Sequence, residues 1–259
     1  MEDAHNGFNN KIRIVNCCKN FHLVDKIFSI SLDNATTNTK AMEFLKEDPN
    51  INMLLNDSLM HVRCCTHILN LCVQEGLDTP TRLNSTYKLL HNAIVNRDIL
   101  THMYNESRTN GRFITNDHWS LAKIMHDVLE TFDNATHIFS YLYEPNIHMV
   151  ILECIKIIYS IKQTSQANPG PSFKNVLDNM KEKWYAYYTE FPPIYGIAAI
   201  LDPGVKIQGI TYDVAYYVNK CKIILERLCE DYGVVIQPDS VGSSKGKSRS
   251  GFLRPILEK

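Results

Sequence analysis

The sequence contains no run of about 18 apolar residues, so it predicts no membrane-spanning helix. Its first residues lack the basic and apolar stretches of a secretory signal, and we expect no such signal. Apolar residues nevertheless make up 44% of the 259 residues, a share too high for a disordered chain. The composition therefore predicts a globular protein with one large domain or two modest ones.

The sequence also has no excess of basic over acidic residues. The chain has 27 basic and 28 acidic residues, which gives a net charge of −1. Domains dedicated to nucleic-acid binding usually carry a clear basic excess, because neutralising phosphates supplies much of their affinity. The charge therefore argues mildly against strong autonomous DNA binding.

The eight cysteines do not have the spacing of a disulfide framework. They form two adjacent pairs and four single positions, several of them inside apolar helical patterns: 17, 18, 64, 65, 72, 154, 221 and 229. We expect reduced thiols, as in the cytosol or the nucleus.

Strand and helix patterns alternate over the first 80 residues. Short β-branched or apolar runs at 27–32 and 59–63 predict buried strands. Helical patterns lie before, between and after these strands, and Gly76 is the expected C-cap of the third helix. This order predicts part of an α/β sheet.

The first of these helices is predicted over residues 8–23. Its expected buried face carries Ile14, Cys17, Cys18 and Phe21, which recur at helical spacing.

After Pro80 the sequence shows helical patterns, and no strand pattern as strong as the two before it. They run through 82–105, 116–141, 146–165, 171–190 and 211–232. We therefore divide the chain into a partial α/β part at 1–80, a helical part at 81–235 and a flexible Ser/Gly/Lys-rich tail at 236–259.

Asp33 stands at the end of the first predicted strand. A carboxylate at such a position can bind a divalent metal. Phosphoryl transfer with two metals, however, needs several converging carboxylates. The alternative is a turn residue, with Asn34 and Thr36 capping the next helix, and the residues alone favour this interpretation.

The Cys64-Cys65-Thr66-His67 element leads from the second strand into a helix. It could supply half of a zinc site, but a second ligand pair at matching spacing is not evident. His67 could instead face a phosphate at the helix N-terminus. A buried Cys beside a satisfied His is the interpretation that spacing alone favours.

Arg82 opens the following helix and could form forked hydrogen bonds with a phosphate, or it could be a solvated residue of the first turn. The aromatic run at 184–188 could stack on nucleic-acid bases, but its helical spacing favours packing between helices.

Several ordered segments resemble the hAT superfamily of DNA transposases, particularly its plant RICESLEEPER-like branch, whose members carry a BED-type zinc finger. The block at 81–87 resembles the Arg-Trp block of the family, with Leu83 where tryptophan is expected. The other similar segments are 28–38, 61–77, 119–140 and 181–203, so the resemblance spans about residues 7 to 235.

This resemblance implies an RNase-H-like core interrupted by a helical insertion, and an Asp-Asp-Glu triad that holds two divalent metals. It makes Asp33 the second acid of the triad and a weak metal ligand. His67 becomes the phosphate-proximal histidine, Arg82 the arginine of the Arg-Trp block, and Cys64 the structural cysteine of the Cys-x-x-His block.

The first acid of the triad, its glutamate and the zinc finger have no counterpart in this sequence. We therefore expect a truncated, degenerate hAT derivative of α+β/α class, with a partial RNase-H-like α/β core followed by a mainly helical insertion region. The expected role is weak, non-specific DNA binding in the nucleus, without catalysis. We expect no cofactor, with Mg²⁺ or Mn²⁺ relevant only if a complete triad were supplied.

Two alternatives stay open. One is a protein-interaction module without a DNA role, and the other is part of a longer active transposase. The expected partners besides DNA are further copies of the chain or related transposases, and no membrane.

Overall fold

The computed structural model describes residues 2–48, 61–80, 82–106, 113–141, 146–167, 169–188, 192–204 and 215–231. By its internal contacts the chain divides into two compact units, 1–62 with 190–259, and 63–189. The predicted tail at 236–259 lies outside the described residues, and the predicted boundary near residue 80 stays a prediction. Within the described ranges, no helix is long and apolar enough to cross a membrane.

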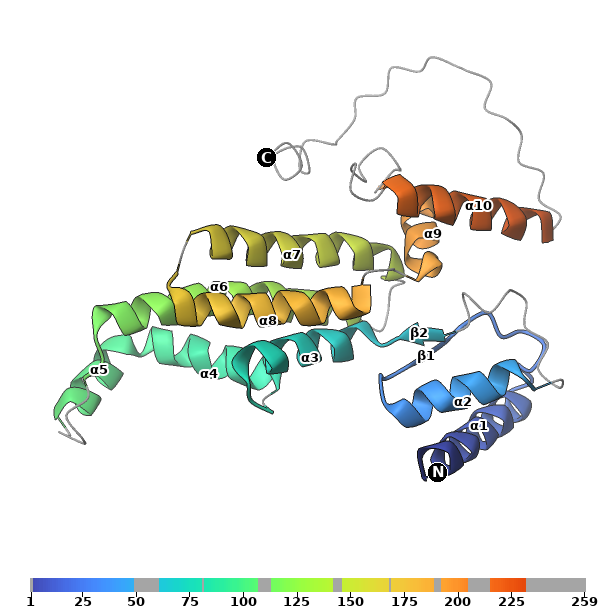
Figure 1. The fold of residues 1–259 in the computed structure, drawn as a ribbon, viewed down its shortest axis with the longest axis horizontal. Helices are drawn as coiled ribbons and strands as arrows, with labels where there is room; N and C mark the ends of the chain where they lie inside the picture. Colours follow the sequence, from blue (N-terminus) through green and yellow to red (C-terminus); the bar gives the residue numbers. More distant parts are fainter. Residues whose placement is uncertain are drawn as a thin grey trace, which may run out of the picture. The chain divides into compact units, whose positions relative to one another are not determined.

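The first unit contains a helix pair and a small sheet (Figure 1). Helix α1 (Glu2–Asn20) packs against α2 (Thr36–Lys46), and strand β1 (Ile30–Leu32) pairs with β2 (His61–Arg63). Their core is a cluster of buried side chains, Val15, Ile27, Met42 and Leu45.

The same unit includes a second helix pair from the C-terminal half of the chain. Helix α9 (Pro193–Leu201) contacts α10 (Ala215–Asp231), and the buried side chains of Ile197, Cys221 and Leu228 form their core. Phe28, just before β1, packs against this cluster. Residues far apart in the sequence therefore share the unit.

The predicted buried face of the first helix is partly wrong. The core residue is Val15, whereas Cys17 is exposed and Phe21 is 70% exposed. Only Ile14 and Cys18 of the predicted face pack against the core. The helix ends at Asn20, so the chain leaves the helical path before Phe21.

The second unit consists of helices that lie alongside one another (Figure 1). Helix α3 contacts α4, α6 and α8; α6 also contacts α4 and α7; and α7 contacts α8. The bounds are α3 (Cys65–Leu77), α4 (Leu83–Val95), α5 (Arg97–Glu106), α6 (Asn116–Phe139), the short 3₁₀ helix η2 (Ile147–Met149), α7 (Val150–Gln166) and α8 (Pro171–Tyr188). The largest buried side chains include Leu69, Leu129, Phe132, Ile157 and Met180.

Gly76 does not end α3, as the sequence had suggested. It is buried inside the helix, which continues to Leu77 and is capped by Asp78 in the left-handed conformation, with φ 50° and ψ 38°. A Cβ atom on Gly76 would lie 2.3 Å from Cγ of Met180 in α8. The glycine therefore permits the close approach of α3 and α8.

Other boundaries also differ from the predictions. The pattern at 82–105 forms two helices, α4 and α5, which meet at Asn96, and α9 was not predicted at all. The strand–helix–strand–helix order of the first 80 residues is confirmed. The described part of the chain contains two paired strands, so an RNase-H-like arrangement stays a prediction.

Candidate functional site

Asp33 builds the turn between β1 and α2. Its exposed side chain accepts hydrogen bonds at Oδ1 from the backbone N–H of Ala35 (2.9 Å) and from Nδ2 of Asn38 (2.7 Å). The N-cap of α2 is Ala35, and no side chain caps it, so the predicted capping by Asn34 and Thr36 is wrong. The turn interpretation of Asp33 itself is confirmed.

A pair of divalent metals does not fit the described surroundings of Asp33. Among the described residues, Asp33 belongs to no group of three side chains that could hold one ion. The neighbouring Asn34 has a buried side-chain amide with no hydrogen-bond partner in that part of the chain, which adds one oxygen but no charge. A two-metal centre needs several converging carboxylates, and the described residues gather no such group at Asp33.

The Cys-x-x-His element forms the first turn of α3. Cys64 is the N-cap, and its Sγ lies 3.0 Å from Oγ1 of Thr66. Cys65 is buried, and His67, two residues further, is half-buried. No second pair of zinc ligands gathers at Cys64 and His67 in the described ranges, so nothing there completes a structural zinc site.

The start of α3 offers backbone donors to an anion. Cys64 makes no side-chain hydrogen bond to the amides of the first turn. Those amides carry the partial positive charge of the helix N-terminus. His67, as the third residue of the helix, lies in that turn and can add a donor from its ring.

Asn70 connects this turn to Arg82. Its Oδ1 accepts a 2.8 Å hydrogen bond from the backbone N–H of Leu83, the first residue of α4. Asn70 follows His67 by three positions, so the two side chains share one face of α3. Arg82 is the exposed N-cap of α4, next to this hydrogen bond. The structure thus ties the Arg82 backbone to the helix face that carries His67.

Asp33 lies in the other unit, so the four predicted site residues divide into one in the first unit and three in the second. Sequence reasoning missed Asn70, although its spacing from His67 was visible. It also missed Arg63, whose guanidinium lies 5.7 Å from the ring centroid of Tyr187. That contact joins residues 124 positions apart, and no local pattern signals it.

The opposite end of α3 is polar and carries more acidic than basic side chains. A cavity of about 290 Å³ there is lined by residues that include Gln74, Glu75, Asp78 and Lys183. Lys183 Nζ donates a 2.8 Å hydrogen bond to Glu75 Oε2, which raises the pKa of Lys183. The acid neutralises the nearby cation, so this end of the helix is less suited to phosphate than the first turn.

The predicted packing role of the aromatic run is confirmed for Trp184 and Tyr188. Both are buried, and their ring centroids lie 4.4 Å apart. All eight cysteines are free thiols, as predicted. Burial raises the pKa of Cys72 to about 12 and raises that of Cys154, so these two thiols are structural rather than reactive.

Comparison with known proteins gives a partial match to transposases. Two proteins of Zea mays, described as the AC and AC9 transposases, are each 38% identical to this chain over 60 residues. The chain is similar to transposases. That similarity covers 22% of the chain and 7% of the length of each relative, so most of both lies outside it.

No protein-family model matches the chain, and no solved structure matches it significantly. The transposase part of the resemblance is therefore supported, and its assignment to a particular branch stays a prediction.

Proposed function

We propose that this chain is a transposase-derived protein of the hAT superfamily, in its RICESLEEPER-like, BED-finger branch, and that it associates weakly with DNA in the nucleus. The association is non-specific and needs no cofactor. The partial similarity to transposases supports the origin. The hydrogen bond from Leu83 to Asn70 is the observation that carries the DNA role, because it holds Arg82 beside the helix of His67.

In this proposal a single DNA phosphate lies at the first turn of α3. Backbone amides and the His67 ring donate hydrogen bonds to it, and the exposed guanidinium of Arg82 adds a forked, charge-assisted contact. Contacts of this kind position a duplex without reading its sequence. The net charge of −1 keeps the affinity low.

Strand cleavage is not part of the proposal. Asp33 Oδ1 already accepts two hydrogen bonds of the turn, and among the described residues Asp33 belongs to no group of three potential metal ligands. If the chain is instead part of a longer active transposase, the missing acids come from elsewhere. Cleavage of supercoiled plasmid with Mn²⁺ that is lost in Asp33→Ala would establish that alternative.

The test is DNA affinity as a function of salt, measured by fluorescence anisotropy of a labelled duplex. We expect binding at low salt, with a slope that becomes shallower by about 1 in Arg82→Gln. His67→Gln should weaken binding of every duplex sequence alike. Arg97→Gln is the matched control, since Arg97 is an exposed arginine of α5 that bonds Oδ1 of Asn116 at 2.9 Å. Absence of binding at low salt, or equal effects of both arginines, would refute the proposal.

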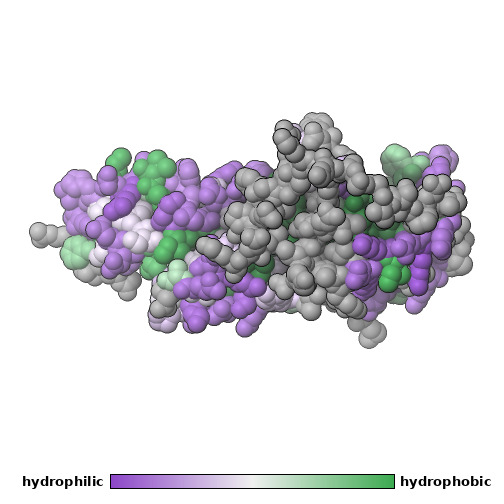
Figure 2. All heavy atoms as spheres, turned by 90° about the horizontal axis from the view of Figure 1, so that it is seen from above, coloured by the Kyte–Doolittle hydropathy of each residue, from purple (hydrophilic) through white to green (hydrophobic). Residues whose placement is uncertain are grey.

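A second candidate, a protein-interaction module, is favoured by the surface of α5. None of its residues is buried, and Ile99 and Met103, four positions apart, are 61% and 63% exposed. Val95, four positions before Ile99, is 69% exposed. Figure 2 shows apolar side chains interrupting the hydrophilic surface at the α5 end of its unit.

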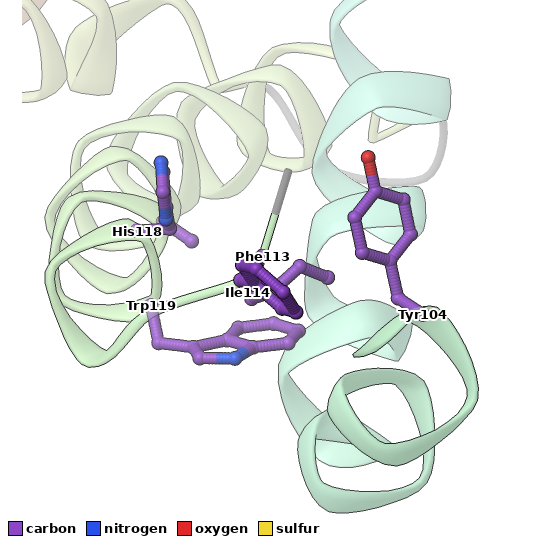
Figure 3. Close-up of a pocket in the computed structure, with 6 residues that line it drawn as sticks. Tyr104, Phe113, Ile114, His118 and Trp119 are labelled. Carbon is purple, nitrogen blue, oxygen red and sulfur yellow. The ribbon is translucent and has the colours of Figure 1, made fainter. Parts of the chain in front are cut away.

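An apolar cavity of about 460 Å³ adjoins this surface. In Figure 3, Trp119 of α6 and Phe113 form one side of it, and Tyr104 of α5 faces them. The Trp119 indole is held by a 2.8 Å hydrogen bond to Oγ1 of Thr101. In this second candidate the surface binds a second copy of the chain, because one apolar helix face can pair with its own copy about a twofold axis. Sedimentation velocity should show a dimer that Met103→Glu dissociates.

A further inference from the structure

A cluster of polar side chains in the second unit has no part in the proposed DNA contact. His126, Asp127 and Glu130 lie on helix α6, and one ligating atom of each lies within 4.8 Å of the others. Glu130 follows His126 by four positions and Asp127 by three, so its carboxylate can reach the same side of the helix as both. Within the described ranges, no other group of three such side chains meets this condition.

His126 is fixed in place by the helices around it. Only 6% of the residue is exposed. Its ring stacks on His91 of α4, with centroids 5.3 Å apart, and lies 5.1 Å from the ring of Tyr87. A ring held by packing against a neighbouring helix loses little further rotamer freedom when it binds a ligand.

The two ring nitrogens of His126 have separate partners. Nε2 lies 3.1 Å from Nδ1 of His91, and Nδ1 lies 3.1 Å from Oδ1 of Asp127. Histidines that ligate a metal usually hydrogen-bond through the nitrogen that does not hold the ion. His91 can serve as that partner, which leaves Nδ1 directed toward the carboxylates.

We propose that His126, Asp127 and Glu130 bind a divalent transition-metal ion of the zinc class, with His91 orienting His126. Two ligand atoms of one tetrahedral zinc lie roughly 3.3 Å apart when the bonds are 2.0–2.1 Å long. The 3.1 Å between His126 Nδ1 and Asp127 Oδ1 is close to that separation. Asp127 and Glu130 are exposed, and the ligating atom of Glu130, whose Oε1 accepts a 3.4 Å hydrogen bond from the Tyr87 hydroxyl, lies within 4.8 Å of the other two.

A cation already competes for this position. Lys123 Nζ lies 2.6 Å from Oδ1 of Asp127, and the two side chains are 59% and 52% exposed. Exposed ion pairs of this kind contribute little to stability, so a divalent ion can displace the ammonium group. A solvated network of Lys123, Asp127 and His126 without a metal is the alternative, and the experiment separates the two.

The experiment is titration of the purified, chelator-treated full chain with Zn²⁺ in competition with a chromophoric chelator. We expect one ion per chain, and Co²⁺ in place of Zn²⁺ should give the intense visible absorption of a low-coordinate site. Glu130→Gln removes a charged ligand, and His91→Gln removes the partner that orients His126. Each variant should weaken zinc binding roughly 10-fold or more. Lys123→Gln should strengthen binding, because the competing ammonium group is removed.

Two controls keep the result decisive. Because Glu130 is exposed, Glu130→Gln should leave the far-UV circular dichroism unchanged, so weaker zinc binding by this variant cannot be ascribed to unfolding. Glu106→Gln alters an isolated pair on α5, in which His102 Nε2 lies 3.4 Å from Glu106 Oε1, and should bind zinc like the unaltered chain. No stoichiometric uptake, or equal affinities of Glu130→Gln and the unaltered chain, overturns the proposal. Because DNA is absent from the assay, the outcome is independent of the proposed DNA role.

Discussion

Gly76 of α3 and Met180 of α8 lie so close that a single added Cβ atom would stand 2.3 Å from Met180 Cγ and 2.8 Å from its Cε. The same Cβ would be 3.0 Å from the backbone oxygen of Val176, which cannot rotate away. The contact between α3 and α8 therefore depends on the absence of a side chain at residue 76. Since α3 carries His67, this packing also positions the candidate site.

We expect Gly76→Ala to destabilise the protein. Overpacking of a close helix contact costs about 1–3 kcal/mol. The better helix propensity of alanine offsets up to about 1 kcal/mol of that loss. Urea unfolding followed by circular dichroism would measure the difference. Gly76→Ala combined with Met180→Ala should lose less stability than the sum of the two single losses, because shortening the fully buried Met180 relieves its contact with the added Cβ. A stability gain in the Gly76→Ala variant alone would contradict the packing argument.

The hydrogen bond between Asn70 and Leu83 leads to a second prediction. Asn70→Ala leaves the Leu83 amide without this acceptor and should lower the free energy of unfolding by about 1 kcal/mol. It should also weaken DNA binding without a change in Arg82 itself. Asn84→Ala, at an exposed position one residue after Leu83, is the control for stability and anisotropy measurements. Unchanged DNA affinity in Asn70→Ala would show that the hydrogen bond between α3 and α4 does not position Arg82 for DNA binding.

The order of elements could be predicted wherever the apolar pattern was long. Helix α6 and helix α8 were predicted to within a few residues, because their buried faces recur over several turns. Helix α9 was missed because the Pro192-Pro193 pair looked like a break. Proline is, however, well suited to the first position of a helix, and α9 begins at Pro193.

Local pattern could not predict what depends on distant neighbours. Glycine is the residue type expected at a C-cap, and only the approach of Met180, more than 100 residues away, explains why a glycine lies inside this helix. In the same way, His126 and Glu130 have a visible four-residue spacing, but the His91 ring that orients His126 comes from another helix. For Asp33, the turn geometry was predicted because Asp residues form such turns from local hydrogen bonds alone.

Asp33 gives a third prediction. Asp33→Ala removes the acceptor of the two hydrogen bonds from Ala35 and Asn38, and by analogy with a lost helix cap it should cost roughly 0.5–2 kcal/mol. Asp33→Asn keeps an oxygen at the Oδ1 position and should retain most of the stability. Thermal unfolding of both variants tests this order. Equal losses in the two would show that the negative charge, rather than the hydrogen-bond geometry, supports the turn.

Cys72 predicts how stability depends on alkaline pH. Burial raises its pKa from 9.0 to about 12 in the folded protein, so the folded state retains the proton that the unfolded state loses first. The stabilisation is complete below pH 9 and is lost as the pH rises from 9 toward 12, by an amount on the order of 4 kcal/mol. Cys154, whose pKa burial also raises, adds to the same trend.

Urea unfolding between pH 8 and pH 11 should therefore show falling stability, and Cys72→Ala should reduce the slope while lowering stability at pH 8. Alkylation with iodoacetamide, read by mass spectrometry, provides an independent measurement. The exposed thiol of Cys17 should be modified in the folded protein, whereas Cys72 and Cys154 should react only after unfolding. Rapid modification of Cys72 under native conditions would mean that the contact between α3 and α8 opens in solution, and the position of His67 would then not be fixed by that packing.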